Sequence, residues 1–301
     1  MNTYIIGIDI GATNTRVAIL NPAGEIKERH RIPSKMEEGR PFFVRVAQLA
    51  ADMAHKSRAQ VIGVGSAGQI HKDTGCYLPG LYPEAPWVGI PLKEIIQAET
   101  GLPVFLDNDC KISAYAELKV GQGRQISDFI SLTLGTGIGG GIITNGQLVH
   151  GEHGLAGHLG HISIDPNGPL CACGNTGCLE LYASGTAVAR RASESLKRTV
   201  DSKEAFQLAA AGDPAAAEVI HSTGHALGRG LGAMANLLNP QRFILSGSIL
   251  EWYDLLKPSI QEGFTKNVMS SLKHTPILQS TLGGDGGIIG AALYAWDHIN
   301  H

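Results

Sequence analysis

The sequence lacks several features that would assign it to a common functional class. It has no run of about 18 consecutive apolar residues, so no membrane-spanning helix is expected. It has no run of five lysines or arginines, and its net charge is −3, which argues against a nucleic-acid-binding surface. The first ten residues lack the basic segment of a signal peptide, so we expect a cytoplasmic protein. The Gly-x4-Gly-Lys-Ser/Thr phosphate loop is also missing.

Cysteine is scarce, and its distribution is uneven. The chain has five cysteines, an odd number that argues against a framework of disulfides in a cytoplasmic protein. Three of the five, Cys171, Cys173 and Cys178, fall within eight residues. This clustering indicates metal chemistry more than structural cross-linking.

Glycine is abundant, and it concentrates in a few short segments. The chain has 39 glycines among 301 residues, a length at which chains often divide into two domains. Apolar and β-branched runs predict strands at residues 4–10, 15–20 and 25–32, which together make an antiparallel meander. A similar pattern recurs at residues 129–134, 141–144 and 147–150, where Asn145-Gly146 is a strong hairpin signal.

This recurrence predicts an internal duplication: two α/β domains, each opening with a meander and a Gly/Thr turn. Two unrelated hairpins are the alternative explanation. Helical spacing or composition predicts the helices, which we expect at residues 42–56, 92–100, 109–119, 186–197, 202–211, 214–238, 253–267 and 288–299. We place the first domain at residues 1–110, completed by the closing helix 288–301, and the second at residues 111–287.

The two Gly/Thr turns carry the first chemical signal. Backbone N–H groups and hydroxyls in such turns point at one spot and bind anions. Asp9 directly precedes the first turn, and phosphoryl transfer needs a carboxylate near the phosphates to hold Mg²⁺. Either turn alone would be read as a tight hairpin, whereas the pair with Asp9 favours a grip on the phosphates of a nucleotide.

Asn108 and Asp109 lie where a predicted strand ends and a helix begins. Both residue types favour helix starts, so capping is one explanation. The other is a general base, because ligands bind at the carboxyl ends of strands in α/β domains and a carboxylate there accepts a hydroxyl proton. The local sequence does not decide between them.

The most specific local pattern combines His161 with Cys171, Cys173 and Cys178. One imidazole and three thiolates form the donor set of a closed, structural zinc site. Three free thiols or a redox dithiol are the alternatives. Glu180 follows the last cysteine by two residues, so a zinc knuckle would hold it rigidly.

These motifs resemble the ROK family of repressors, open reading frames and kinases, over nearly the whole chain. The segments are Gly-His-Leu-Gly-His at 157–161, Cys-Ala-Cys-Gly-Asn-Thr-Gly-Cys-Leu-Glu at 171–180, Asp-Ile-Gly-Ala-Thr at 9–13, Leu-Gly-Thr-Gly-Ile-Gly-Gly-Gly at 134–141, Asn-Asp at 108–109, Leu-Ser-Gly-Ser at 245–248 and Asp-Gly-Gly-Ile-Ile-Gly-Ala-Ala at 285–292. The resemblance implies two ribonuclease-H-like domains of the actin/hexokinase type with a cleft between them, and a homodimer or homotetramer.

The resemblance also implies an ATP-dependent sugar kinase that uses Mg²⁺ with ATP and holds a structural zinc ion. Asp109 would be the base. The sugar contacts would be Asn108, His158, His161, Glu180, Ser66 and Gly68. The ATP contacts would be Asp9, Gly11, Ala12, Thr13, Asn14, Thr15, Gly135, Thr136, Gly137, Gly139, Gly247 and Gly286. His161 would use one ring nitrogen for zinc and the other for the sugar.

Three departures from the family pattern leave the sugar open. His158 stands where most family kinases carry Glu, the Pro-Gly of the sugar loop is missing at residues 66–68, and no Asn lies between Leu78 and Trp87. A histidine at position 158 resembles the N-acetylmannosamine kinases of the family, which also carry His there. The first turn, followed by Arg16, looks more like that of allose kinase. We expect phosphorylation, at O6, of an aldohexose or N-acylated hexosamine such as glucose or N-acetylmannosamine, with allose or fructose as alternatives.

The family also contains sugar-responsive regulators, which form the competing class. These carry a helix-turn-helix domain ahead of the first Gly/Thr turn. Here the first predicted strand begins at about Tyr4, so we expect an enzyme whose partners are a sugar and ATP, not a nucleic acid or a membrane. A sugar sensor that lacks the DNA-binding domain remains the second possibility.

Overall fold

The computed structural model describes residues 3–81 and 83–300, which fold into two compact units. The first unit comprises Met1–Ile126, Gly141–Gly157 and Leu282–His301, and the second comprises Ser127–Gly140 and His158–Thr281. The chain therefore leaves and re-enters the first unit twice, and the C-terminal helix belongs to it.

The first unit is built on a five-stranded mixed sheet. Its strands are β1 (Ile5–Ile10), β2 (Asn14–Leu20), β3 (Ile26–Pro33), β4 (Val61–Ser66) and β5 (Val104–Asn108). They lie in the order β3-β2-β1-β4-β5. The pairs β1–β2 and β2–β3 are antiparallel, which confirms the predicted meander, and the pairs β1–β4 and β4–β5 are parallel.

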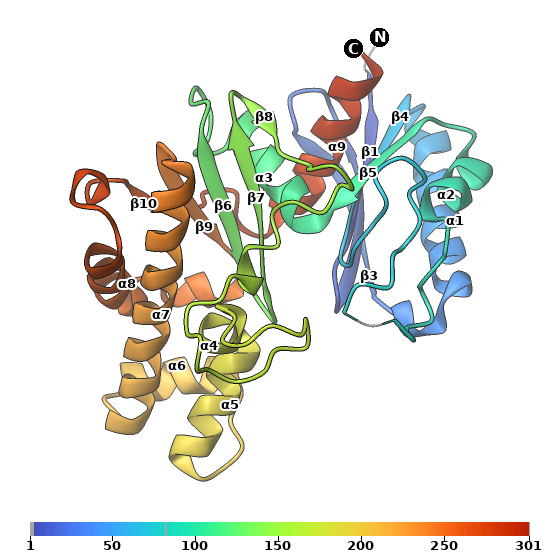
Figure 1. Ribbon diagram of the computed structural model, residues 1–301. Helices are drawn as coiled ribbons and strands as arrows, with labels where there is room; N and C mark the ends of the chain where they lie inside the picture. Colours follow the sequence, from blue (N-terminus) through green and yellow to red (C-terminus); the bar gives the residue numbers. More distant parts are fainter. Residues whose placement is uncertain (1–2, 82, 301) are drawn as a thin grey trace. The chain divides into compact units, whose positions relative to one another are not determined.

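Helices cover both faces of this sheet (Figure 1). They are α1 (Arg40–Ser57), α2 (Leu92–Thr100), α3 (Asp109–Val120) and α9 (Gly286–Ile299). Helices α1 and α2 pack against one face, where Ile6, Ile8 and Phe43 belong to the larger core. Helix α9 packs against the other, where Ile5 and Ile288 share a second core. A strand buried on both faces needs a continuous apolar run, which is why β1 and β4 do not alternate.

The second unit repeats this arrangement. Its sheet contains β6 (Phe129–Leu134), β7 (Ile138–Thr144), β8 (Gln147–Leu148), β9 (Arg242–Ser246) and β10 (Ile277–Gln279). The order β10-β9-β6-β7-β8 is the same as that of the first sheet, written from the opposite edge. The pairs β6–β9 and β9–β10 are parallel and β7–β8 is antiparallel. The shared strand order agrees with the internal duplication that the two Gly/Thr turns indicated.

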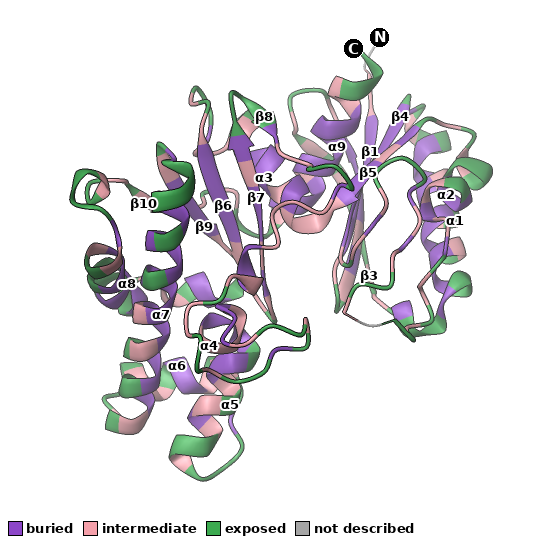
Figure 2. Ribbon diagram, in the orientation of Figure 1, coloured by how far each residue is buried: buried purple, intermediate pink, exposed green. Residues whose placement is uncertain are grey.

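The remaining helices belong to the second unit. They are α4 (Glu180–Ala183), α5 (Gly185–Leu196), α6 (Ser202–Ala210), α7 (Pro214–Leu238) and α8 (Tyr253–Asn267). Along α7, buried and exposed positions alternate with helical periodicity (Figure 2). Its buried stripe faces α8, α6 and α5. Among the described residues, no helix has both the length and the apolar character needed to cross a membrane.

The strands of the second unit differ from the sequence-based expectation at three points. Strand β7 begins at Ile138, where we expected a turn to continue to Gly140, and β8 ends at Leu148 instead of His150. The glycines misled the expectation: a Cβ on Gly140 would lie 2.7 Å from the Ser131 carbonyl oxygen, so this glycine serves close packing within a strand. The short strand β10 was not predicted at all.

The two units also differ from the expected division near residue 110. Helix α3 and Gly141–Gly157 lie in the first unit. Within that unit α3 packs closely against α9, and Tyr115 of α3 donates a hydrogen bond to the Asp297 carboxylate of α9. A sequence-based boundary does not register such a contact, because its partners are 182 residues apart.

A buried ion pair lies beneath the loop of residues 150–157 in the first unit. Lys111 of α3 is 2% exposed, and its Nζ lies 3.2 Å from Asp107 Oδ1. Lys111 also donates to the Gly154 carbonyl, and His150 Nδ1 lies 2.8 Å from Asp107 Oδ2. Burial opposes ionisation of Asp107, but the His150 and Lys111 contacts outweigh it and lower the pKa of this carboxyl.

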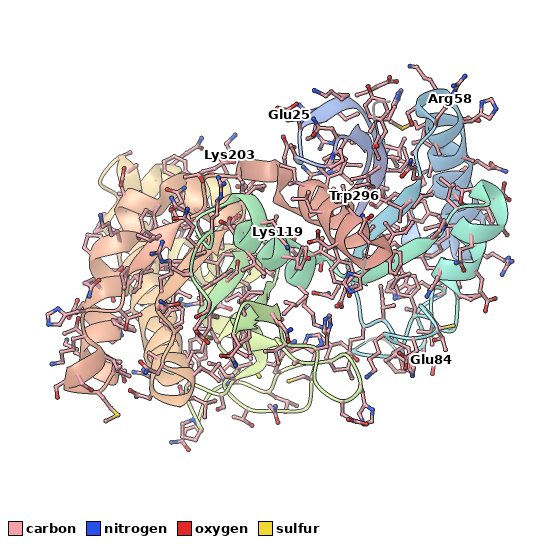
Figure 3. The ribbon with its side chains drawn as sticks, turned by 90° about the horizontal axis from the view of Figure 1, so that it is seen from above. Glu25, Arg58, Glu84, Lys119, Lys203 and Trp296 are labelled. Atoms are coloured by element: carbon pink, nitrogen blue, oxygen red, sulfur yellow. The ribbon has the colours of Figure 1, made fainter. Side chains whose placement is uncertain are left out.

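The substitution Lys111→Met should destabilise the fold strongly, because it leaves the buried Asp107 carboxylate without its ammonium partner. Losing one member of a buried pair costs about 3–5 kcal/mol. Urea unfolding would measure the change in free energy. Lys119→Met is the matched control on the same helix (Lys119 is labelled in Figure 3): its pair with Asp297 is 40% exposed on the lysine side, so about 1 kcal/mol or less is expected. Equal losses in the two variants would contradict the structural role of Lys111.

Candidate functional site

Asp9 ends up buried beside an arginine and a helix start. It lies near the end of β1, directly opposite Arg16 in the β1–β2 pairing. Arg16 Nη2 lies 2.6 Å from Asp9 Oδ2, and Nη1 donates to the Gly284 carbonyl. Burial raises the pKa of Asp9, and Arg16 opposes this effect. The carboxylate is therefore held in place by a cation that also contacts the turn before α9.

The glycines at the start of α9 make room for the Asp9 carboxylate. Gly286 is the first residue of the helix, and a Cβ on Gly287 would lie 2.9 Å from Asp9 Cγ. The N-terminus of a helix carries partial positive charge, which favours a carboxylate or a phosphate nearby. Two segments that the sequence assigned to the nucleotide, at residues 9 and 286, thus meet within the first unit.

The first Gly/Thr turn exposes only part of its predicted contact set. Ala12 and Thr13 are exposed at its tip. Thr15 is fully buried, and its hydroxyl lies 2.8 Å from that of Ser34. The Asn14 carboxamide accepts a hydrogen bond from Arg31 Nε at 2.9 Å. The tip therefore offers donors at Ala12 and Thr13, whereas Thr15 supports the turn from within.

Asn108 caps helix α3. Its Oδ1 accepts hydrogen bonds from the backbone N–H groups of Cys110 and Lys111 at 3.0 and 3.4 Å. Its Nδ2 donates to the Gly68 carbonyl at 3.1 Å, which ties β5 to the loop after β4. The capping role is thus present in the structure, and it fixes the backbone that presents Asp109.

Asp109 is the first residue of α3, at the carboxyl end of the β5 strand. Its pKa is raised to about 6, first by burial and then by the negative charge of Asp9. The backbone N–H of Cys110 donates to Oδ1 at 2.9 Å, and this bond acts in the opposite direction. A carboxyl with such a pKa exchanges a proton near neutral pH, as a general base does.

The end of β4 and the loop after it hold the other predicted sugar residues of this unit. Ser66 is fully buried, and its hydroxyl lies 2.5 Å from that of Tyr77. Burial raises the pKa of Tyr77, so this bond joins two neutral hydroxyls. Gly68 has φ of 100°, a conformation that favours glycine. Ser66 therefore shapes the loop from inside, and the Gly68 backbone is the part that contacts Asn108.

In the second unit, the turn at Gly135–Gly137 is fastened to the start of α5. The Gly135 carbonyl accepts from the Gly185 N–H at 2.7 Å, and the Thr136 carbonyl accepts from the Thr186 hydroxyl at 2.8 Å. Gly247, with φ of 103°, packs on the end of β6, where a Cβ would collide with the Leu134 carbonyl. The two predicted nucleotide turns of this unit are therefore neighbours. Gly139 lies in strand β7, beyond the turn.

Glu180 lies against the same turn. It is the first residue of α4, and its Oε2 accepts a hydrogen bond from the Ile138 N–H at 2.7 Å. A Cβ on Gly137 would lie 2.5 Å from that oxygen, so only glycine fits there. The structure thus brings a predicted sugar ligand and a predicted phosphate turn together.

The Cys/His cluster assembles as its spacing indicated. The ligand atoms of His161, Cys171, Cys173 and Cys178 all lie within 4.8 Å of one another. Cys171 Sγ is 3.7 Å from His161 Nδ1, and Cys173 Sγ is 3.5 Å from Cys178 Sγ. Ligands at about 2.0–2.3 Å from a tetrahedral zinc ion are separated by about 3.5–3.8 Å. The donor set therefore fits zinc in type and number, and the two distances from Cys171 to His161 and from Cys173 to Cys178 match this spacing, with Nδ1 as the imidazole ligand. The ring centroid of His158 is 6.4 Å from that of His161.

Several residues near these sites escaped the sequence analysis. Arg16 was noted only as a cue to the sugar, although it pairs with Asp9, and Tyr77 was not considered. Alternation along β2 places Arg16 across from Asp9 once the hairpin register is known, so a signal for Arg16 existed. No comparable signal existed for Tyr77, whose partner comes from another strand.

Comparisons with known proteins agree with this geometry. Residues 5–298 match the ROK family. The chain is 34% identical to a glucokinase of Halalkalibacterium halodurans over 95% of its own length and 93% of that protein. It is 32% identical to an N-acetylmannosamine kinase of Shigella boydii, with 96% and 97% covered.

A solved structure gives the same result for the fold. The ROK family glucokinase of Streptomyces griseus, in complex with glucose and AMPPNP, superposes with a TM-score of 0.84 at 29% identity, over 98% of this chain and 99% of that one. The two mixed sheets with matching strand order are therefore those of the actin/hexokinase-like fold. The family match, the relatives and the superposition lead to one conclusion: the chain belongs to the ROK family.

Proposed function

We propose that this protein is an ATP-dependent sugar kinase that phosphorylates O6 of an aldohexose or an N-acylated hexosamine. The similarity to a glucokinase and to an N-acetylmannosamine kinase supports this substrate class. The observation that carries the proposal is the state of Asp109, a half-buried carboxyl that directly follows the edge strand β5 and has a pKa of about 6. A protein that only sensed sugar would need no such base.

Asp109 acts on the sugar hydroxyl. In its ionised form it accepts the hydroxyl proton as the oxygen attacks the terminal phosphoryl group of ATP, and ADP leaves. Asn108 holds the start of α3 by capping it, so the carboxylate keeps its position at the strand end. Positioning and charge neutralisation supply most of the rate enhancement in this reaction class.

The nucleotide phosphates are assigned to the two Gly/Thr turns. The exposed residues Ala12, Thr13 and Thr136 at the tips of these turns offer backbone donors that suit phosphate oxygens. Asp9, with Arg16 beside it, is the carboxylate assigned to Mg²⁺, directly or through water. Mg²⁺ bound there with ATP would neutralise the charge that develops on the phosphates.

The sugar is assigned to His158, His161 and Glu180 in the second unit and to Asn108 in the first. His161 turns Nδ1 toward Cys171, which leaves Nε2 for a sugar hydroxyl. Glu180 uses Oε2 for the Ile138 N–H, and Oε1 is the oxygen we assign to the sugar. Zinc in the Cys/His cluster would fix the tautomer and the angle of His161, so its role is structural.

Asp109→Asn should lose turnover by about 10²–10⁴-fold, because it removes the general base. In the unsubstituted protein, kcat/KM should fall about tenfold per pH unit below pH about 6 and level off above it, because the reaction needs the ionised carboxylate. Steady-state kinetics from pH 5 to 9 would measure both. Turnover of the variant near the parent rate would show that Asp109 is not the base.

Sugar binding and folding serve as the control for this variant. Because the folded pKa of Asp109, about 6, lies above its ordinary value of 3.8, this carboxyl lowers the stability of the fold progressively as the pH rises from about 3.8 to about 6, and the full loss is present above pH about 6. The Asn side chain is neutral at every pH, so the melting temperature of the Asp109→Asn variant at pH 8 should equal or exceed that of the parent protein. Unchanged sugar affinity with no loss of stability would separate a catalytic defect from misfolding.

Purified protein should contain one zinc ion per chain. Metal analysis would give the stoichiometry, and a thiol reagent should titrate two cysteines, Cys76 and Cys110, before chelation and all five afterwards. Cys178→Ser should lower zinc content and raise the KM for sugar through His161, while Cys110→Ser should leave the metal in place. No zinc and five reactive thiols in freshly purified protein would contradict the zinc assignment.

His158→Glu should change the choice of sugar, because it exchanges an imidazole for a carboxylate close to His161. An ADP-release assay would compare glucose, mannose, fructose, allose, N-acetylglucosamine and N-acetylmannosamine. We expect the variant to change the ratio of kcat/KM between glucose and N-acetylmannosamine at least about tenfold, which corresponds to about 1.4 kcal/mol. An unchanged ratio would place specificity elsewhere.

A further inference from the structure

The second unit contains a pocket of about 310 Å³ that none of the assigned functions uses. Its walls come from α7, α5 and α4 and from Ile164, which lies between His161 and Cys171 of the Cys/His cluster. The ionisable side chains that line it are those of Tyr182, Arg191, His221, His225 and Arg229. No carboxylate is among the lining residues, although the whole chain carries a net negative charge.

One wall of the pocket is a regular stripe on α7. His221, His225 and Arg229 follow one another at intervals of four residues, which places them on one face of the helix. Arg229 and His221 are exposed, and His225 is half-buried. Three nitrogen-bearing side chains therefore reach the same opening from successive turns.

The opposite wall contains a guanidinium without an acidic partner. Arg191 of α5 is half-buried, and Nη1 donates to the Tyr182 carbonyl at 3.0 Å and to the Thr223 hydroxyl at 3.2 Å. Nη2 donates to the Ser222 hydroxyl. All three acceptors are neutral, so they orient the guanidinium without neutralising it. Burial lowers the pKa of Arg191, as expected for a cation without a counter-ion.

Arg229 is in the same situation. Its Nη1 donates to the Ile164 carbonyl at 3.1 Å, which is again a neutral acceptor. Within the described residues, neither Arg191 nor Arg229 lies within 4.0 Å of a carboxylate, although the exposed neighbour Arg190 is paired with Glu194 at 3.0 Å. Two guanidinium groups thus share one pocket with no counter-ion.

The acidic groups near the pocket do not pair with its two arginines. Glu194 and Glu218 act on Arg191 electrostatically, but neither forms an ion pair with it, and Glu194 is paired with Arg190. Glu262 lies 3.4 Å from His221 Nε2 and 2.6 Å from Lys266, and Asp165 accepts a hydrogen bond from the Tyr182 hydroxyl at 2.9 Å. These contacts neutralise at most His221. The charge of Arg191 and Arg229 remains to be balanced by something that enters the pocket.

We propose that this pocket binds the phosphate group of a phosphate monoester or of free inorganic phosphate. Guanidinium groups recognise phosphate oxygens through paired N–H donors, and a doubly charged anion balances two of them. The imidazoles of His225 and His221 supply further donors on the same wall, whereas the Ser222 hydroxyl already donates to the carbonyls of Glu218 and Val219. Ile164 and Ala226 give the pocket an apolar side that an esterified sugar ring would cover.

The site is independent of the proposed phosphoryl transfer. It uses none of the residues assigned to ATP, sugar or zinc, so it can be tested without turnover. Tyr182 nevertheless lies two residues after Glu180 on α4, and its carbonyl is bonded to Arg191. An anion in the pocket would therefore contact the helix that carries a proposed sugar ligand.

Isothermal titration calorimetry would test the proposal. The full chain would be titrated with inorganic phosphate, glucose 6-phosphate and uncharged glucose at constant ionic strength. Arg229→Gln and His225→Gln remove pocket donors at positions that are not fully buried. Arg190→Gln is the matched control, because it removes a neighbouring arginine of α5 that does not line the pocket. Each pocket variant should weaken phosphate binding about 10–100-fold, as expected for a hydrogen bond to a charged group, while the control stays unchanged.

The outcomes distinguish a sugar phosphate from free phosphate as the ligand, and they distinguish binding in the pocket from binding at the nucleotide turns. Tighter binding of glucose 6-phosphate than of phosphate would identify a sugar phosphate, and equal binding would identify free phosphate. Either result supports the site if Arg229→Gln weakens that binding about 10–100-fold. Binding that survives in both pocket variants would belong to the phosphate turns and would overturn the proposal. The proposal would also be overturned if neither anion bound, or if Arg190→Gln weakened phosphate binding as much as the pocket variants do. The kinase activity of Arg229→Gln at low phosphate should equal that of the parent, so failure here would leave the proposed function intact.

Discussion

Parallel pairing of β1, β4 and β5 brings the carboxyl ends of three strands to one edge of the first sheet. The register sets Ile10 beside Ser66 and Ser66 beside Asn108. Asp9 and Asp109, a hundred residues apart in the chain, therefore reach the same region and influence each other electrostatically. Most features of this unit follow from the need to keep two carboxyl groups in a place that is partly closed to water.

Burying an ionised carboxyl group costs free energy, and the surrounding residues reduce this cost more for Asp9 than for Asp109. Asp9 has Arg16 at 2.6 Å and the start of α9 beside it, which offset part of the effect of burial, although its pKa is still raised. No cation among the described residues forms an ion pair with Asp109, and burial together with Asp9 raises its pKa to about 6. Two acids at one sheet edge thus acquire different properties, which suits one for holding a cation and the other for moving a proton.

The second unit has a sheet of the same strand order, but its predicted site residues are held in a different way. Glu180 and His161 come from a long irregular segment that has little regular structure to hold it. The three cysteines fold this segment onto itself, and the Glu180 carboxylate is anchored to the Ile138 N–H at 2.7 Å. A glycine at position 137 is required, because any side chain there would meet the carboxylate. The cluster and the glycine turn therefore position Glu180 jointly, and neither would do so alone.

The sequence by itself determined the family, the duplicated α/β architecture and the membership of the Cys/His cluster, because these depend on residue types at short, fixed spacings. Helices such as α7 and α8 were predicted to the residue, since apolar periodicity and flanking cap residues are local. Only the tertiary structure decided that Ser66 and Thr15 are buried, that Asn108 joins β5 to the Gly68 loop, and that Arg16 restrains Asp9. It also assembled Arg191 and Arg229 in one pocket. These relations depend on strand register and helix packing between distant segments, and no short window of sequence contains both partners.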